Sequence, residues 1–314
     1  MASVLNAPHF QDETAAYAKL ESLVWPNGPV CPHCGGTERV KRMGGKSTRP
    51  GLHKCYDCRK QCRVTFGTVF ESSHVPLHIW LQAAYLLCSS KKGISSNQLA
   101  RTLGVTVKTG WFMSHRLRLA RTEGKLPPMG GEGEVVEIDE TFIGNKEGVK
   151  VQRGYRHKHA VLSLVQRGAK GATVRSFHVS GTARADLLPI IKAHVLPGTH
   201  VMTDEAVQYA RLDKEFAAHD FTKHGAGEYV RDGLIHTNTV EGFYSVFKRG
   251  MKGVYQHCRE HNLHRYVSEF DFRYNNRVKL GVDDEHRAVK ALQGITGKRL
   301  TYRGRSEPEL EIPY

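Results

Sequence analysis

Three acidic residues occupy positions where a carboxylate site for divalent metal ions could form. Asp139 ends the run EVVEID and Asp204 ends the run THVMTD, so each is predicted near the end of a strand. Carboxylates at strand ends often build sites in α/β folds, although a single aspartate there is more often a turn residue or a helix cap. Glu241 belongs to a third segment, residues 236–253, and adds a third acid.

The third segment, HTNTVEGFYSVFKRGMKG, has the periodicity of an amphipathic helix. At about 100° per residue, five polar residues fall within one narrow arc and apolar residues fall opposite. The polar arc contains Asn238, Glu241, Ser245, Lys248 and Lys252. Two interpretations stay open on periodicity alone: a polar face that forms part of a site, or a solvated face with stabilising pairs along the helix.

Two pairs of cysteines with the spacing CxxC predict a zinc site. The pairs are Cys31 with Cys34 and Cys55 with Cys58. One tight turn can direct both sulfurs of a pair toward one ion, so the four thiolates suit tetrahedral Zn²⁺ in a closed, structural site. Other potential ligands nearby are not assigned to the site, because four ligands complete it. The alternative to a zinc site is a set of ordinary buried or free cysteines. A disulfide framework is disfavoured, because the chain has seven cysteines and no recognisable secretory signal.

Residues 94–121 predict two helices joined by a turn. Ser95 or Ser96 can cap the first helix, Gly104 lies at the turn, and Thr106 can cap the second helix. The second helix has an apolar side, and the side opposite carries Lys108, Trp111, His115 and Arg118. Such a face is typical of a recognition helix in the major groove, and an αα-hairpin with a charged solvent face is the alternative.

The net charge favours a polyanionic partner. The 314 residues include 46 Lys and Arg against 31 Asp and Glu, a balance of +15 whose surplus lies mainly in the first two-fifths of the chain. Nucleic acid is the simplest partner, and a basic but merely solvated surface is the alternative. No run of eighteen apolar residues exists, which excludes a membrane span. We therefore expect a cytoplasmic protein that is associated with the nucleoid when it is bound to DNA.

The elements that must position these residues change type along the chain. Residues 10–25 predict a short helix, and residues 77–121 are helical by periodicity. The segment KLPPMGGEGE, residues 125–134, is the best linker. Strands follow in EVVEIDETFIG, HAVLSLVQ, TVRSFHVSG and THVMTD, with a helix in RADLLPIIKAHVL, and the chain from about Gln208 is predicted to be mainly helical. This pattern favours a separate α/β domain after the linker.

Three blocks of the sequence resemble those of bacterial insertion-sequence transposases of the DDE type. The blocks are EIDETFIG, TDE, and HTNTVEGFYSVFKRGMKGVY together with LHRYVSEFDFRYNNR. The run YDCRKQCRVTFGTVFE adds to the resemblance. The resemblance is greatest for the subgroup with an N-terminal zinc ribbon, and this subgroup is similar to the eukaryotic Merlin elements. The resemblance extends roughly from Phe10 to Arg277.

The resemblance implies an RNase H-like domain whose first and fourth strands lie side by side. Asp139 and Asp204 would then meet, Glu241 would arrive from a helix, and the three acids would hold two Mg²⁺ or Mn²⁺ ions. Lys248 would hold a phosphate, and Asn238 would orient a terminal nucleotide or a water molecule. In this subgroup Asn can replace the third acid, and here the acid is present.

The expected fold class is a multidomain combination of α+β and α/β parts. The parts are an N-terminal helix (1–25), a zinc ribbon (26–70), a helix-turn-helix DNA-binding region (71–124), the linker (125–134), an RNase H-like catalytic domain with a mixed sheet (135–282) and a C-terminal tail (283–314). The tail carries no motif, and we expect it to pack on a partner subunit or to be a surface extension.

The expected function is that of a DNA transposase acting as a homo-oligomer on double-stranded DNA. It would bind terminal inverted repeats, cleave at the ends of its element and join 3′-hydroxyls to target DNA, with Lys252 among the DNA-binding residues. Two alternatives stay open: a structure-specific nuclease that uses the same metals, and a transposase-derived DNA-binding regulator without catalysis. The three intact acids disfavour the regulator, and strand-transfer products would distinguish the transposase from the nuclease.

Overall fold

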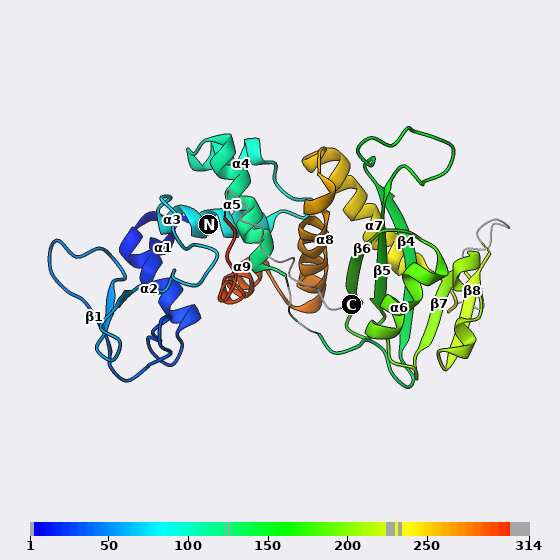
Figure 1. Cartoon of the computed structure of the whole chain (residues 1–314), viewed down its shortest axis with the longest axis horizontal. Coiled ribbons are helices and arrows are strands. Elements are labelled where there is room, and N and C mark those ends of the chain that lie inside the picture. The colour runs from blue at the N-terminus through cyan, green and yellow to red at the C-terminus, as the bar shows by residue number, and fades with distance from the viewer. Residues whose placement is uncertain (1–2, 123, 125, 224–229, 232–233, 302–314) are drawn as a thin grey trace. The chain divides into compact units, whose positions relative to one another are not determined.

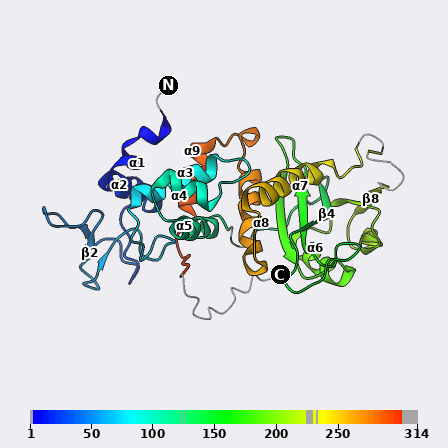
Figure 2. The same ribbon diagram turned by 90° about the horizontal axis from the view of Figure 1, so that it is seen from above.

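The computed structural model describes residues 3–122, 124, 126–223, 230–231 and 234–301. These residues divide into two compact units, which Figure 1 and Figure 2 show in two orientations. The N-terminal unit contains the described residues up to 122, apart from 91–93, together with 283–301. The C-terminal unit contains 91–93 and the other described residues up to 282. The parts of the expected segments that fall on 1–2, 123, 125 and 302–314 lie outside the described residues.

The N-terminal unit begins with short helices followed by a small sheet. A 3-10 turn (Val4–Asn6) precedes α1 (Pro8–Gln11) and α2 (Glu13–Val24), and the Asp12 carboxylate caps α2 by accepting a hydrogen bond from the Ala15 amide. The antiparallel sheet has the order β1 (Val40–Arg42), β2 (His53–Cys55), β3 (Gln61–Cys62). Such short strands bury little apolar surface, so this sheet needs support from elsewhere.

Longer helices form the main core of the N-terminal unit. They are α3 (Leu77–Ser89), α4 (Ser96–Leu103), α5 (Val107–Ala120) and α9 (Asp284–Gln293). Ser95 caps α4 and Thr106 caps α5, as their sequence positions predict. Gly104 ends α4 in the left-handed region at φ 65°, a conformation that glycine adopts without steric cost.

Residues 283–301 differ from the expected tail, because they are part of the N-terminal core. Arg287 donates a hydrogen bond of 2.7 Å to the carbonyl oxygen of Cys88 at the end of α3. Leu292 and Ile295 are buried in the same core as α3, α4 and α5. This packing could not be predicted, because one short amphipathic helix does not reveal which distant helices it covers.

The C-terminal unit is built on a five-stranded mixed sheet, drawn mostly in green in Figure 1. Its strands are β4 (Val135–Ile143), β5 (His159–Gln166), β6 (Thr173–Val179), β7 (His200–Asp204) and β8 (Ala218–Thr222). The order is β6-β5-β4-β7-β8, antiparallel from β6 to β4 and parallel from β4 to β8. The strand β8 corrects the expectation of mainly helical structure after Gln208, because AHDFT lacks the apolar alternation that indicates a strand.

Helices cover both faces of this sheet. The helix α6 (Arg184–His194) shares a core with one face, and α7 (Asn238–Gly250) and α8 (Glu260–Asn275) share a core with the other. A π-helical turn (Met251–Tyr255) follows α7, and 3-10 turns occur at Val207–Tyr209, Leu212–Lys214 and Val278–Leu280. Ile138 lies in the α6 core, so Asp139, the next residue of β4, points to the α7 face.

None of the helices described combines the length and apolar character that crossing a membrane requires.

Candidate active site and zinc-binding site

Asp139 and Asp204 lie on neighbouring parallel strands. The β4–β7 register pairs Val136 with Val201 and Glu137 with Met202, and two further residues bring Asp139 level with Asp204. The alternation of strand side chains places both aspartates on the α7 face of the sheet. Both are partly buried. Two carboxylates far apart in sequence therefore lie side by side, Asp204 at the end of β7 and Asp139 in the middle of β4 instead of at its end as expected.

The helix α7 brings Glu241 to this face through a contact that sequence reasoning missed. Glu137 is fully buried, and its carboxylate accepts hydrogen bonds of 2.9 Å from the backbone amides of both Thr239 and Val240. A carboxylate at a helix N-terminus satisfies free amides and interacts favourably with the helix dipole. Glu137 thereby fixes the first turn of α7, which carries Glu241, against β4.

Other contacts strengthen this junction. The Arg167 Nε atom donates to Glu137 Oε1 at 2.6 Å, and Arg167 also donates to the carbonyl oxygen of His236 at 2.8 Å. The Tyr244 hydroxyl, one turn after Glu241, donates to the main-chain oxygen of Asp139 at 2.5 Å. The only hint in the sequence was an acid between the apolar residues Val136 and Ile138.

Negative charge accumulates around Asp139. Burial, with the neighbouring carboxylates of Glu140, Asp204 and Glu241, raises the pKa of Asp139 to about 8. Like charges close together disfavour the ionised form, and so does removal from water. A positive ion bound beside these groups would relieve both costs.

Lys248 is the nearby cation on α7. Burial lowers the pKa of Lys248, while Asp139 and Glu241 act in the opposite direction because their charges attract the ammonium group. Its Nζ atom lies 5.9 Å from the centre of the Tyr244 ring. The polar arc expected from the sequence therefore has Lys248 and Glu241 both within electrostatic reach of Asp139.

Carboxylate oxygens are suitable ligands for a hard divalent cation such as Mg²⁺. In the part of the chain that the structure describes, the carboxylate oxygens of Asp139, Asp204 and Glu241 do not all lie within 4.8 Å of one another. The arrangement thus offers the right ligand chemistry but does not present all three acids to a single ion. Glu140 is engaged on the α6 face, where Gln208 Nε2 donates to it at 2.6 Å.

The other residues expected near this site are solvent-exposed. Asn238 is the first residue of α7 and lies before Glu241 on the same helix. Lys252 is in the π-helical turn that follows α7. Both are therefore accessible from solvent, unlike Asp139 and Asp204.

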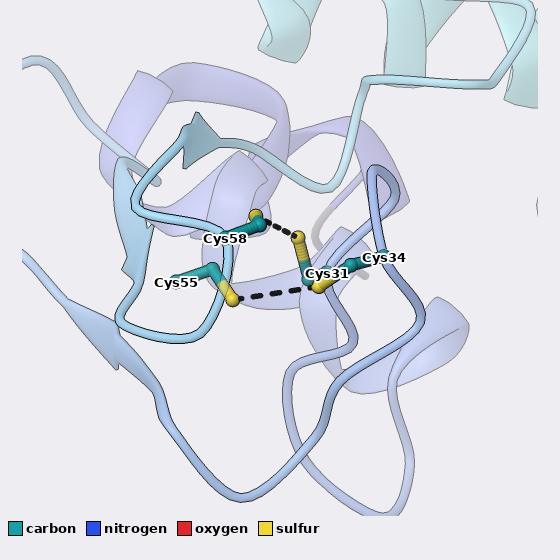
Figure 3. Close-up of side chains that lie close together, drawn as sticks. All are labelled: Cys31, Cys34, Cys55 and Cys58. Atoms are coloured by element: carbon teal, nitrogen blue, oxygen red, sulfur yellow. Dashed lines mark hydrogen bonds between the residues drawn. The ribbon is translucent and has the colours of Figure 1, made fainter.

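The four cysteines predicted to bind zinc converge, as Figure 3 shows. The sulfur atoms of Cys31 and Cys58 are 3.6 Å apart, and so are those of Cys34 and Cys55. Four Zn–S bonds of about 2.3 Å in a tetrahedron would separate the sulfurs by about 3.8 Å, so the spacing fits zinc. Cys62 lies on β3 nearby, and burial raises the pKa of its thiol to about 11. The four-thiolate set is complete without it and forms a closed zinc site.

Part of the arc that was predicted to face DNA on α5 is buried in the structure. Lys108 and Trp111 are exposed, but His115 and Arg118 are each only 1% exposed. Arg118 donates a hydrogen bond of 3.0 Å to the Ser114 hydroxyl, within the same helix. The helical wheel assumed that one face of α5 packs, whereas α3, α4 and α9 all contact this helix and cover more of its circumference.

Comparison with known proteins relates both regions to one family. A sequence model of the ISXO2-like transposase domain matches residues 131–275, and one of the transposase zinc-ribbon domain matches residues 11–61. The chain therefore contains an ISXO2-like transposase domain preceded by a transposase zinc-ribbon domain. The transposase-domain match contains all three acids, and the zinc-ribbon match contains all four cysteines.

A relative encoded by a mobile element agrees with these domain matches. The chain is 28% identical over 280 residues to "Uncharacterized protein in transposable element ISH50" of Halobacterium salinarum. The match covers 84% of this chain and 91% of that protein. The match is longer than either domain match taken alone.

Proposed function

We propose that this protein is a DNA transposase that binds the terminal inverted repeats of its element, cleaves at the element's ends and joins 3′-hydroxyls to target DNA. The observation that carries the proposal is the level placement of Asp139 and Asp204 on neighbouring parallel strands. Glu241 and Lys248 approach them on α7, the helix that Glu137 holds against β4. The match to the transposase-domain model supports the same conclusion.

The catalytic domain has an RNase H-like fold in this proposal. Three antiparallel strands followed by two parallel ones, in the order β6-β5-β4-β7-β8, are consistent with it. Helices on both faces are also consistent with it.

The acids hold two Mg²⁺ or Mn²⁺ ions in this proposal. When bound, such ions activate the attacking water or 3′-hydroxyl and stabilise charge on the phosphorus and the leaving oxygen. Asp139, Asp204 and Glu241 would supply the carboxylate ligands for these ions. The raised pKa of Asp139 supports this assignment, because it results from burial together with nearby negative charge that bound cations would neutralise.

The remaining polar residues of α7 act on the DNA. Lys248 holds a phosphate of the scissile strand as a point charge. Asn238, exposed at the start of α7, orients the terminal nucleotide or a water molecule. Lys252 contacts the DNA backbone beyond them.

The N-terminal unit recognises the element's ends. The helix pair α4–α5 is a helix-turn-helix in this proposal, and the exposed Lys108 and Trp111 on α5 face the DNA together with the zinc ribbon. The net charge of +15 supports a polyanionic partner. Two ends must be handled together, so the active form is a homo-oligomer on DNA.

The test is an assay with a labelled oligonucleotide that carries an element end. Asp139→Asn, Asp204→Asn and Glu241→Gln should keep the fold and end binding but lose cleavage, because each change removes charge with little change of shape. Lys248→Ala should lose less activity than these three. Glu205→Gln is the matched control, since Glu205 is exposed and adjoins Asp204.

The metal requirement is tested in buffer without added Mg²⁺ or Mn²⁺, because a strong chelator would also strip the zinc ribbon. Full cleavage by Asp139→Asn, or by the wild type without a divalent cation, would overturn the catalytic assignment. Cleavage without joined products would identify a structure-specific nuclease. End binding without cleavage by the wild type would identify a DNA-binding regulator.

A further inference from the structure

A second group of metal-ligand side chains lies in the C-terminal unit, and the proposed transposition chemistry does not use it. His159 is the first residue of β5, His178 lies on β6, and Glu260 is the first residue of α8. One donor atom from each lies within 4.8 Å of the others. His159 Nδ1 is 3.7 Å and His178 Nε2 is 3.8 Å from the same atom, Glu260 Oε1.

Both imidazole nitrogens that face Glu260 are shielded from solvent and have no hydrogen-bond partner in the described structure. Distances of 3.7 and 3.8 Å to the carboxylate are longer than a hydrogen bond between nitrogen and oxygen. A buried polar atom left without a partner is energetically unfavourable, because it has lost its hydrogen bonds to water. The side chain of His159 is only 5% exposed, so solvent has little access to it. A further partner for these two imidazole nitrogens would therefore be favourable.

The backbone places the two histidines on one face of the sheet. His178 pairs with Val161 across the β5–β6 ladder, and Val161 lies two residues after His159 on the same strand. Val161 belongs to the core that α7 and α8 cover, so both histidines point toward these helices. The arrangement is thus built by the sheet register and not by chance contact of surface side chains.

The position in the fold indicates what the site would do. Farther along α8, Asp271 accepts hydrogen bonds from the Ser176 amide and hydroxyl at 2.7 and 2.8 Å. Asn275 exchanges hydrogen bonds with the backbone of Val174 on β6. These contacts hold the later turns of α8 to the sheet. A ligand shared by the two histidines and Glu260 would hold its first turn.

We infer that His159, His178 and Glu260 form a second metal site, for a divalent transition-metal ion of the zinc class. Two imidazoles and one carboxylate are a donor set that Zn²⁺ uses. In a tetrahedral zinc site the nitrogen and oxygen ligands are about 3.4 Å apart, so the observed separations need to close by only a few tenths of an ångström. The Glu260 side chain is 58% exposed and is able to make that movement.

The role of this ion is structural. It clips the first turn of α8 to the edge of the sheet, and a solvent molecule reaches the fourth ligand position from the exposed side of Glu260. The site lies on strands and a helix that Asp139, Asp204 and Glu241 do not occupy. The inferred metal site can therefore be confirmed or refuted independently of the proposed transposase chemistry.

The first test is metal analysis of the purified full-length protein after it is loaded with Zn²⁺ and freed of loosely bound ions. Wild type should hold two zinc ions per chain, one in the ribbon and one here. His159→Gln and His178→Gln should each hold one. His261→Gln is the matched control, because His261 is an exposed neighbour of Glu260 outside the three-residue group, and it should keep two. One zinc per wild-type chain would overturn the inference.

A second measurement covers the case in which a histidine variant fails to fold. Glu260→Gln alters an exposed side chain and should fold normally, but it should weaken the second Zn²⁺ by at least tenfold. In the Co²⁺-loaded protein, the second equivalent should add visible absorption bands without the sulfur-to-metal charge transfer of the four-cysteine site, and Glu260→Gln should lose these bands. If the second equivalent adds no bands in the wild type, Glu260 instead forms ion pairs with protonated histidines and the metal site is excluded.

Discussion

Glu137 and Thr239 are joined by two hydrogen bonds, from the Thr239 amide at 2.9 Å and from its hydroxyl at 2.6 Å. Glu137 is a fully buried residue of β4, and Thr239 is the second residue of α7. The same strand carries Asp139 and the same helix carries Glu241. This one junction therefore sets how the third acid approaches the sheet.

Replacing Glu137 with Gln should destabilise the C-terminal unit. The change keeps the shape but leaves Arg167, whose Nε atom is 2.6 Å from Glu137 Oε1, without its opposite charge. Breaking a buried pair in this way costs about 3–5 kcal/mol. Urea unfolding followed by circular dichroism measures the loss. Glu132→Gln, at an exposed position just before β4, should change the free energy of unfolding by less than about 0.5 kcal/mol. Equal stability of the two variants would refute the role of Glu137.

The pKa of Asp139 predicts how stability depends on pH in the absence of Mg²⁺. The folded-state pKa is about 8, whereas an unperturbed aspartate has a pKa of 3.8, so between these values the folded protein binds more protons at this carboxyl than the unfolded chain does. The contribution of Asp139 to stability is therefore present at low pH and is lost as pH rises toward about 8. The slope is at most about 1.4 kcal/mol per pH unit.

Asp139→Asn should remove this dependence. Relative to the wild type, the variant should gain at least about 1 kcal/mol of unfolding free energy between about pH 5 and pH 8 in Mg²⁺-free buffer. Adding Mg²⁺ at the higher pH should stabilise the wild type and leave the variant unchanged. Parallel stability curves for the two proteins would show that Asp139 does not carry a raised pKa.

How much the sequence revealed depended on how local each signal was. The CxxC pairs, the caps Ser95 and Thr106 and the long apolar strands are patterns within a few residues, and the structure has them where they were expected. The short strand β8 has no such pattern and exists because β7 offers it a parallel partner. The helix α9 likewise depends on helices almost two hundred residues earlier in the chain.

The same distinction between local and distant signals applies to the residues of the candidate site. Strand periodicity predicted both strands that carry the aspartates. Asp204 ends β7 as expected, whereas Asp139 lies in the middle of β4, because the strand continues to Ile143 through polar residues. Glu137 could not be assigned a role, because its function is a contact with backbone amides about a hundred residues away. The burial of His115 and Arg118 was also hidden, since a helical wheel does not show how many neighbours surround a helix.

Two residues of α5 should respond to substitution in opposite ways. Arg118 is buried, so Arg118→Ala should lower the free energy of unfolding by about 2 kcal/mol or more through lost packing and hydrogen bonding. Lys108 is exposed, so Lys108→Ala should keep the fold and reduce the salt dependence of DNA binding by about one unit of slope. Thermal unfolding and binding titrations at several salt concentrations measure the two effects. Normal stability of Arg118→Ala with weaker DNA binding would restore Arg118 as a DNA contact.

The zinc ribbon should depend on its metal for folding. The strands β1, β2 and β3 contain only eight residues together, and the cluster of buried apolar residues around them is Val40, Cys31, Cys55 and Cys62. A core this small contributes little hydrophobic stabilisation, whereas a structural zinc supplies on the order of 10 kcal/mol to a small domain. Cys34→Ser and Cys55→Ser should therefore lose one zinc per chain and expose residues 26–70 to limited proteolysis.

The same variants should bind element ends more weakly while the C-terminal unit stays folded, because the four-cysteine site lies wholly in the N-terminal unit. Cys258→Ser is the matched control: Cys258 is a partly buried cysteine of the C-terminal unit outside the zinc cluster, and its loss should leave zinc content unchanged. Zinc analysis, proteolysis and circular dichroism on the same samples separate the local effect from global unfolding. Resistance of residues 26–70 to protease in a zinc-free Cys55→Ser protein would mean that the small sheet folds without the metal.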